Sequence, residues 1–137
     1  MPFPLLSVRP FIVLLALAAA AVALAGCQSG AVPGEGPGIK GYADGELNGN
    51  VSAPLDAAVA AVMQELVQMG VLNAEEQRDN LLVEINARTL GEVPVRIRVS
   101  RVSDDLSKVR IRAGTGDEAM ARSIFGRIRG RLQQQYN

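Results

Sequence analysis

Few side chains in this sequence of 137 residues could carry out acid–base or nucleophilic chemistry. The sequence has no histidine, the commonest general base and metal ligand, and Cys27 is its one cysteine. No serine stands in a Gly-x-Ser-x-Gly turn, and no glycine-rich loop with a lysine follows a predicted strand. Hydrolytic triads and phosphate-binding loops are therefore disfavoured, and the remaining enzymatic route is a pair of carboxylates.

Three groups of carboxylates could divide the roles of acid and base: Glu75-Glu76 with Asp79, Asp104-Asp105, and Asp117-Glu118. Each group has a simpler interpretation, which is a polar connection, a turn and a helix cap, respectively. A catalytic carboxylate needs burial or a close partner, and the sequence indicates neither. We therefore expect no enzymatic activity and no cofactor.

The segment from Asp44 to Gly49 resembles the start of a calcium loop, because oxygen-bearing side chains alternate before a glycine. The twelfth position should supply a bidentate glutamate but is Leu55, and a Gly/Pro-rich stretch stands where the entering helix belongs. We therefore expect a bent edge strand and no metal site.

Cys27 follows a segment with the layout of an export signal. Arg9 is the one cation before an uninterrupted apolar run from Phe11 to Leu24. A membrane-spanning helix needs about 20 apolar residues, and this run is shorter. We therefore predict a signal peptide over residues 1–26.

The sequence Leu24-Ala25-Gly26-Cys27 resembles the lipobox of bacterial lipoproteins, which the lipoprotein signal peptidase cuts just before the cysteine. The resemblance implies a diacylglycerol thioether on Cys27, often with a third acyl chain such as palmitate on its freed amine. Two or more acyl chains anchor a protein stably to a membrane. Gln28 replaces the aspartate that favours inner-membrane retention, which implies an outer-membrane lipoprotein facing the periplasm.

The lipid-bearing cysteine and the residues after it, 27–41, are rich in Gly and Pro and predict a flexible tether. Residues 42–137 then form a single domain. A domain of about 95 residues buries roughly 60–70% of its surface on folding, which suffices without a disulfide.

The first part of this domain changes from a strand pattern to a helical one. Residues 42–52 alternate weakly and predict a strand. Apolar residues at helical spacing over 55–69 predict a helix that Pro54 opens and Gly70 ends, with a further short strand possible near Val71.

Three alternating segments predict strands over 81–87, 95–99 and 109–113, the last two joined as a hairpin. A capping-box pattern, Thr115-Gly116-Asp117-Glu118, precedes helical spacing of apolar residues over 120–132. The order β-α-β-β-β-α predicts an α+β two-layer sandwich, in which two helices cover one face of an antiparallel sheet and the other face is wet.

Several segments carry a resemblance that covers most of Tyr42 to Leu132: Gly45-Glu46-Leu47, Ala53-Pro54-Leu55-Asp56, the Val-Arg-Ile-Arg strands and Gly114-Thr115-Gly116-Asp117-Glu118-Ala119. The domain resembles a family of short bacterial lipoproteins catalogued as a domain of unknown function. No motif of that family is catalytic, so the resemblance supports the fold and supplies no activity.

Charge is distributed unevenly along the chain although the formal total is zero. Residues 27–87 carry two cations and nine carboxylates, giving −7, and residues 88–137 carry eleven cations and five carboxylates, giving +6. This asymmetry predicts either pairing between the two halves or a basic face offered to an anionic partner.

The candidate anion face consists of arginines on two neighbouring strands: Arg96, Arg98, Arg110 and Arg112. If Ile97 and Ile111 both face the core, Arg98 lies opposite Arg110 or Arg112. Like charges directly opposite destabilise a pair of strands by roughly 0.2–1 kcal/mol. Relief could come internally from Glu84 and Glu46, or externally from a phosphate or carboxylate polymer.

A second candidate surface lies on the last helix. Gly126 and Gly130 are predicted to face outward, opposite the apolar stripe, and a helical glycine costs about 1 kcal/mol relative to alanine. The pair either reflects sequence drift or forms a shallow groove, flanked by Arg122 and Arg129, for a partner helix.

We therefore expect a lipid-anchored periplasmic protein with a non-enzymatic domain that binds an envelope protein or polymer. The alternative is a binder of an anionic envelope ligand, such as lipopolysaccharide, phospholipid headgroups or a cell-wall polymer. Nucleic acid is disfavoured by export and by the lack of aromatic side chains among the strand arginines. The sequence leaves the oligomeric state open.

Overall fold

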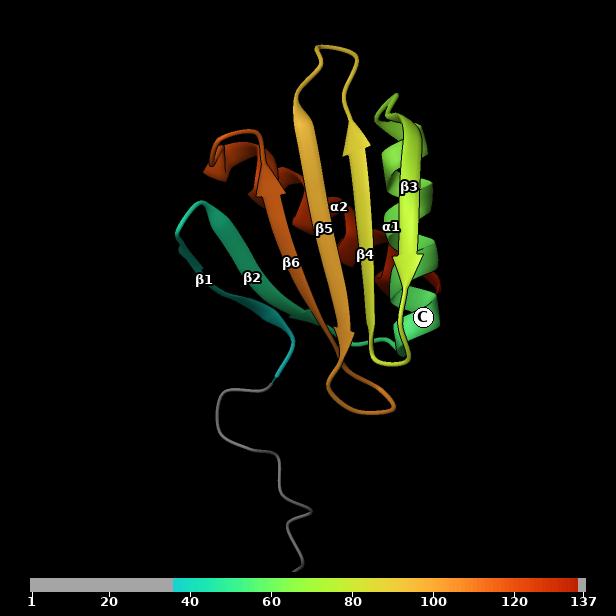
Figure 1. Cartoon of the computed structure of the whole chain (residues 1–137). Coiled ribbons are helices and arrows are strands. Elements are labelled where there is room, and N and C mark those ends of the chain that lie inside the picture. The colour runs from blue at the N-terminus through green and yellow to red at the C-terminus, as the bar shows by residue number, and fades with distance from the viewer. Residues whose placement is uncertain (1–35, 136–137) are drawn as a thin grey trace, which may run out of the picture. The chain divides into compact units, whose positions relative to one another are not determined.

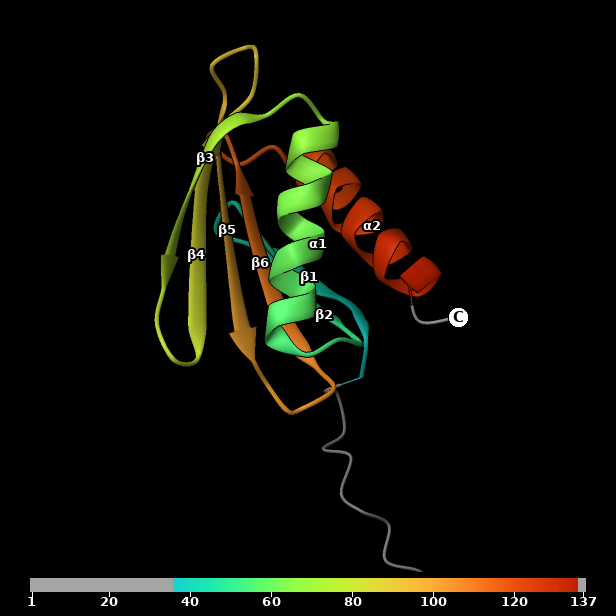
Figure 2. The ribbon, with the colours of Figure 1, turned by 90° about the vertical axis from the view of Figure 1, so that its right-hand side faces the viewer.

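The computed structural model of the chain describes residues 36–135. The predicted signal peptide, the lipobox with Cys27 and most of the predicted tether lie outside the described residues. Within them, six strands form one antiparallel sheet, and two helices cover one of its faces (Figure 1, Figure 2). The predicted α+β two-layer sandwich is therefore confirmed.

The elements follow one another along the chain as β1 (Gly38–Ala43), β2 (Glu46–Val51), α1 (Leu55–Gln68), β3 (Leu72–Arg78), β4 (Leu82–Arg88), β5 (Pro94–Arg101), β6 (Ser107–Ala113) and α2 (Glu118–Gln135). Their order across the sheet is β1-β2-β6-β5-β4-β3. Strands β5 and β6 thus lie at the centre, with β1 and β3 at the edges. Neither helix of residues 36–135 is long and apolar enough to cross a membrane.

The sequence pattern predicts one strand over residues 42–52, but the structure has a hairpin of two strands, β1 and β2. Strand β1 begins at Gly38, inside the segment predicted to be tether. Asp44 and Gly45 connect it to β2 with φ angles of 53° and 76°, the left-handed values that a two-residue type I′ turn requires. The folded part of the chain therefore begins closer to Cys27 than the sequence pattern indicates.

Strand β3 corrects a second prediction. Glu75 and Glu76 lie within this edge strand, not in a polar connection. Arg78, at the end of β3, forms an ion pair of 2.5 Å with Asp56 in the first turn of α1. Hydrogen bonds from Arg78 to Asp56 and then Glu76 raise the pKa of its guanidinium above the ordinary value.

The predicted end of α1 is confirmed. Gly70 adopts a φ of 74°, and its N–H donates to the carbonyl of Val67 at 3.1 Å. The N–H of Val71 donates to the carbonyl of Leu66 at 2.9 Å, which completes a Schellman motif. Leu66 and Val71 are both buried, so the chain folds back onto the last turn as expected.

The start of α2 differs from the predicted capping box. The carboxylate of Asp117 accepts a hydrogen bond of 2.9 Å from the N–H of Met120, and the helix begins at Glu118. Asp117 is therefore the N-cap residue, a role that the sequence pattern gave to Thr115.

The core lies between the sheet and the two helices. Ile97 and Ile111 are directly paired on β5 and β6, and both are fully buried. Helix α2 contributes Phe125, which lies over Gly49 of β2. A Cβ added at Gly49 would lie 2.5 Å from Cε2 of that ring, so the close approach of α2 to the sheet requires glycine here.

Candidate functional site

The face of the sheet turned away from the helices, called the open face below, carries the candidate arginines. Because Ile97 and Ile111 point into the core, the alternating residues of β5 and β6 point to the open face. Its cations are Arg88, Arg96, Arg98, Lys108, Arg110 and Arg112, and its carboxylates on the strands are Glu46, Glu75 and Glu84. Six cations against three carboxylates leave a surplus of three positive charges.

The register of the central hairpin places arginine directly against arginine. Arg98 lies opposite Arg110, and Arg96 lies opposite Arg112. The sequence predicted the first of these pairs as one of two possible registers. Both pairs bring like charges together at the middle of the sheet, so both need relief.

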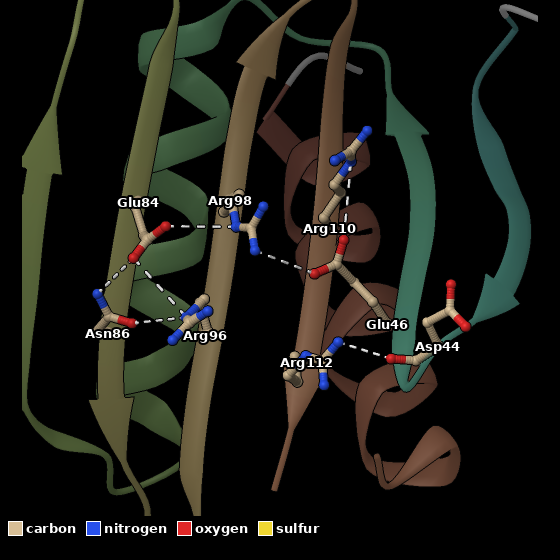
Figure 3. Close-up of polar contacts among 8 residues, drawn as sticks. All are labelled: Asp44, Glu46, Glu84, Asn86, Arg96, Arg98, Arg110 and Arg112. Carbon is tan, nitrogen blue, oxygen red and sulfur yellow. Dashed lines mark hydrogen bonds and ion pairs between the residues drawn. The ribbon is translucent and has the colours of Figure 1, made fainter. Parts of the chain in front are cut away.

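Two glutamates on the flanking strands supply part of that relief, as predicted. Glu46 of β2 lies 3.7 Å from Arg98 and 3.9 Å from Arg110 (Figure 3). Glu84 of β4 lies 3.4 Å from Arg98 and 3.9 Å from Arg96 (Figure 3). The Arg98–Arg110 pair is therefore held between two carboxylates.

The Arg96–Arg112 pair has weaker compensation. Arg96 Nε donates to the side-chain oxygen of Asn86 at 3.4 Å, and its one ion pair with another described residue is the 3.9 Å contact with Glu84. Arg112 donates to the backbone carbonyl of Asp44 at 2.7 Å (Figure 3). Among residues 36–135, no carboxylate lies within ion-pair distance of Arg112. Neutral acceptors thus orient this pair without neutralising it.

A cleft of about 760 Å³ opens at the end of the sheet where α1 ends and the β4–β5 loop begins. Its lining includes Arg88, Arg96 and Arg112 together with Asn86 and Thr89. Arg98 and Arg110 do not line it. The structure therefore divides the four candidate arginines into a compensated pair outside the cleft and an undercompensated pair inside it.

The two glycines of α2 face away from the sheet, as predicted. A Cβ added at Gly126 or Gly130 would meet nothing within 4 Å. Arg122, one of the two predicted flanking arginines, forms a 2.6 Å ion pair with Glu118 one turn earlier. The surface around these glycines is thus open.

Of the carboxylates weighed for catalysis, Asp79 and Asp104 line one cleft of about 620 Å³. Glu76 pairs with Arg78, and Asp104 pairs with Arg101 beside its turn. Asp117 caps α2. Among the described residues, no group of three or more acidic side chains converges as a metal site would require.

The sequence pattern did not identify the polar link between the helices. Glu65 of α1 is buried, and it lies 2.5 Å from Arg131 and 3.9 Å from Arg127 of α2. The sequence could not indicate these ion pairs, because they depend on how α1 and α2 pack against each other.

Fold and face together define a two-layer α+β domain whose open sheet face is rich in arginine. Residues 10–131 match a family described as a protein of unknown function, DUF3568, and the chain belongs to this family. A comparison with curated proteins found no match.

Proposed function

We propose that the protein is an exported lipoprotein, acylated on Cys27, whose domain binds a partner near the membrane surface of the periplasm. One observation carries this proposal: the family match covers residues 10–131 and so includes the apolar run, Cys27 and the whole sheet. The family match thus spans both the lipobox-like sequence and the domain, which supports the proposal of an anchored domain. Binding requires an accessible surface, and the open face offers one that the helices do not cover.

The anchor is tested by replacing Cys27. We expect Cys27→Ala to abolish incorporation of labelled fatty acid and to leave uncut precursor, because thioether formation precedes cleavage in lipoproteins of this type. Ser29→Ala, two residues further on, is the matched control and should be labelled and cut as the parent is. Persistent labelling of the Cys27→Ala variant in intact cells would contradict the anchor.

A second candidate function is the binding of an anionic envelope ligand, favoured by the surplus of positive charge on the open face. Salt dependence separates this function from binding of a packed protein partner. Screening releases a phosphate-rich ligand from exposed arginines sooner than it disrupts an apolar protein contact. A partner that is captured by crosslinking at low salt, but is no longer captured when moderate salt is added before the crosslinker, favours the anionic ligand.

A further inference from the structure

We infer that the cleft at the end of β4, β5 and β6 binds a single phosphate group, and that Arg96 and Arg112 hold it. This inference rests on the proposed anion-binding function of the open face and narrows it to two of the four candidate arginines. The ligand is of one chemical class, a phosphate ester whose remaining part is uncharged.

The charges of the four arginines are unevenly compensated. Arg98 contacts both Glu46 and Glu84, whereas Arg112 has no carboxylate partner in residues 36–135. An external anion gains most where positive charge is not already neutralised. Arg96 is also more accessible than Arg98, since 49% of its side chain is exposed compared with 31%.

The spacing of Arg96 and Arg112 suits one phosphate group. Arg96 and Arg112 are directly opposite on neighbouring strands, which places their Cα atoms about 4.5–5.5 Å apart. Two guanidinium groups at this spacing can donate to different oxygens of one phosphate, and their planar forks suit that geometry. A dianionic phosphate ester would neutralise both charges at once.

Both side chains are already oriented by neutral acceptors. The Asp44 carbonyl holds Arg112, whose Nη1 lies 3.4 Å from the position of a Cβ added at Gly45. Asn86 accepts from Arg96. Side chains held in place before binding lose less conformational entropy when the ligand arrives.

The remaining cleft residues indicate what the ligand carries besides phosphate. Glu75 and Glu92 also line the cleft and would repel further negative groups. Leu90, which is 79% exposed, and Pro94 add apolar surface. A compact phosphate with an uncharged remainder therefore fits this cleft better than a polyanion.

The test compares two double variants of the full chain purified in nonionic detergent. Calorimetry with glycerol 3-phosphate should show that Arg96→Gln/Arg112→Gln weakens binding by about tenfold or more, which corresponds to about 1.4 kcal/mol. The matched control, Arg98→Gln/Arg110→Gln, should bind nearly as the parent does. Thermal unfolding of each variant verifies that the fold is intact.

A second probe identifies the source of the phosphate. Calorimetry with the water-soluble lipid dihexanoyl phosphatidic acid, with dihexanoyl phosphatidylcholine as its control, presents the same phosphate on a lipid. If Arg96→Gln/Arg112→Gln loses binding of the phosphatidic acid but not of glycerol 3-phosphate, the inference is supported with a headgroup as the ligand. The opposite result supports it with a soluble ester.

Two results would overturn the inference, and they have different consequences for the proposed functions of the protein. Equal weakening in both double variants rejects the cleft but retains anion binding by the whole open face. No binding of either probe by the parent, with Cys27 still acylated, rejects the phosphate site and leaves the lipid anchor standing.

Discussion

At the scale of single residues, Gly49 shows how a position in the sheet is fixed by an element far along the chain. Its core-facing side lies under Phe125 of α2, a ring that is 1% exposed and so has little room to move. The sequence shows only a glycine that interrupts a weak strand pattern. Its role depends on which helix residue packs over it, and that follows from the tertiary fold alone.

We expect Gly49→Ala to lower the free energy of unfolding by about 1–3 kcal/mol, the usual cost of forcing an extra group into a packed core. The new Cβ would lie 2.5 Å and 2.6 Å from two ring carbons of Phe125, so the ring or α2 must shift. Urea denaturation of the purified chain measures the change.

The control for this prediction is Gly126→Ala on the outward side of α2, where an added Cβ meets nothing within 4 Å. This variant should gain up to about 1 kcal/mol, because alanine favours the helix more than glycine does. If Gly49→Ala also gained stability, backbone propensity rather than packing would govern Gly49.

At the scale of elements, the sequence predicted those whose hydrophobic pattern is regular. Both helices and the three strands from β4 to β6 are confirmed, because each buries one face and repeats apolar residues at its own period. Edge strand β3 was predicted only as a possible short strand near Val71, and its extent was not predicted, since its polar residues Glu75, Glu76 and Gln77 show no alternation. The β1–β2 hairpin had a usable signal in Asp44-Gly45, a dipeptide that favours type I′ turns.

At the N-terminus of α2, Asp117 caps the helix in place of Thr115, the residue that the capping-box pattern predicts as the cap. Asp117→Ala should cost about 1 kcal/mol of stability, because it removes the acceptor for the N–H of Met120 and a negative charge at the positive end of the helix. Thr115→Ala should cost much less, since Thr115 lies two residues before the cap. Thermal unfolding of the two variants ranks them, and the reverse order would restore Thr115 as the cap.

At the scale of the whole molecule, the fold interleaves the acidic and basic halves of the chain. Strand order β2-β6-β5-β4 places the arginine-rich β5 and β6 between two strands that carry Glu46 and Glu84. The helices repeat the arrangement, because Glu65 comes from the acidic half and Arg131 from the basic half. The predicted internal pairing is therefore confirmed, and the surplus on the open face remains beside it.

The sequence could predict the four arginines and their two glutamate partners, because strand alternation alone decides which side chains share a face. It could not predict that Arg96 and Arg112 differ from Arg98 and Arg110. That difference depends on the register of β5 against β6 and on the β1–β2 turn, whose Asp44 carbonyl reaches Arg112. Register and long-range turn contacts are set by packing.

The alternation of acidic and basic strands predicts that Glu46 and Glu84 stabilise the fold most strongly at low salt. In the double variant Glu46→Gln/Glu84→Gln, two opposed arginine pairs lose their carboxylates, and each such pair costs roughly 0.2–1 kcal/mol. We expect the variant to be less stable than the parent by about 1 kcal/mol at low salt, as measured by urea denaturation. Glu92→Gln, which removes an exposed carboxylate from the β4–β5 loop, should change stability little, because exposed ion pairs contribute little.

Repulsion among the arginines is electrostatic, so added salt should remove it. The Debye length falls from about 30 Å at 0.01 M salt to about 3 Å at 1 M, so at high salt the dissolved ions screen the repulsion between the exposed arginines. The gap in stability between the parent and Glu46→Gln/Glu84→Gln should therefore narrow steadily as sodium chloride is added. A gap that stays constant over this range would show that the two glutamates stabilise the sheet through packing or hydrogen bonds, and the open face would then carry no electrostatic strain for a ligand to relieve.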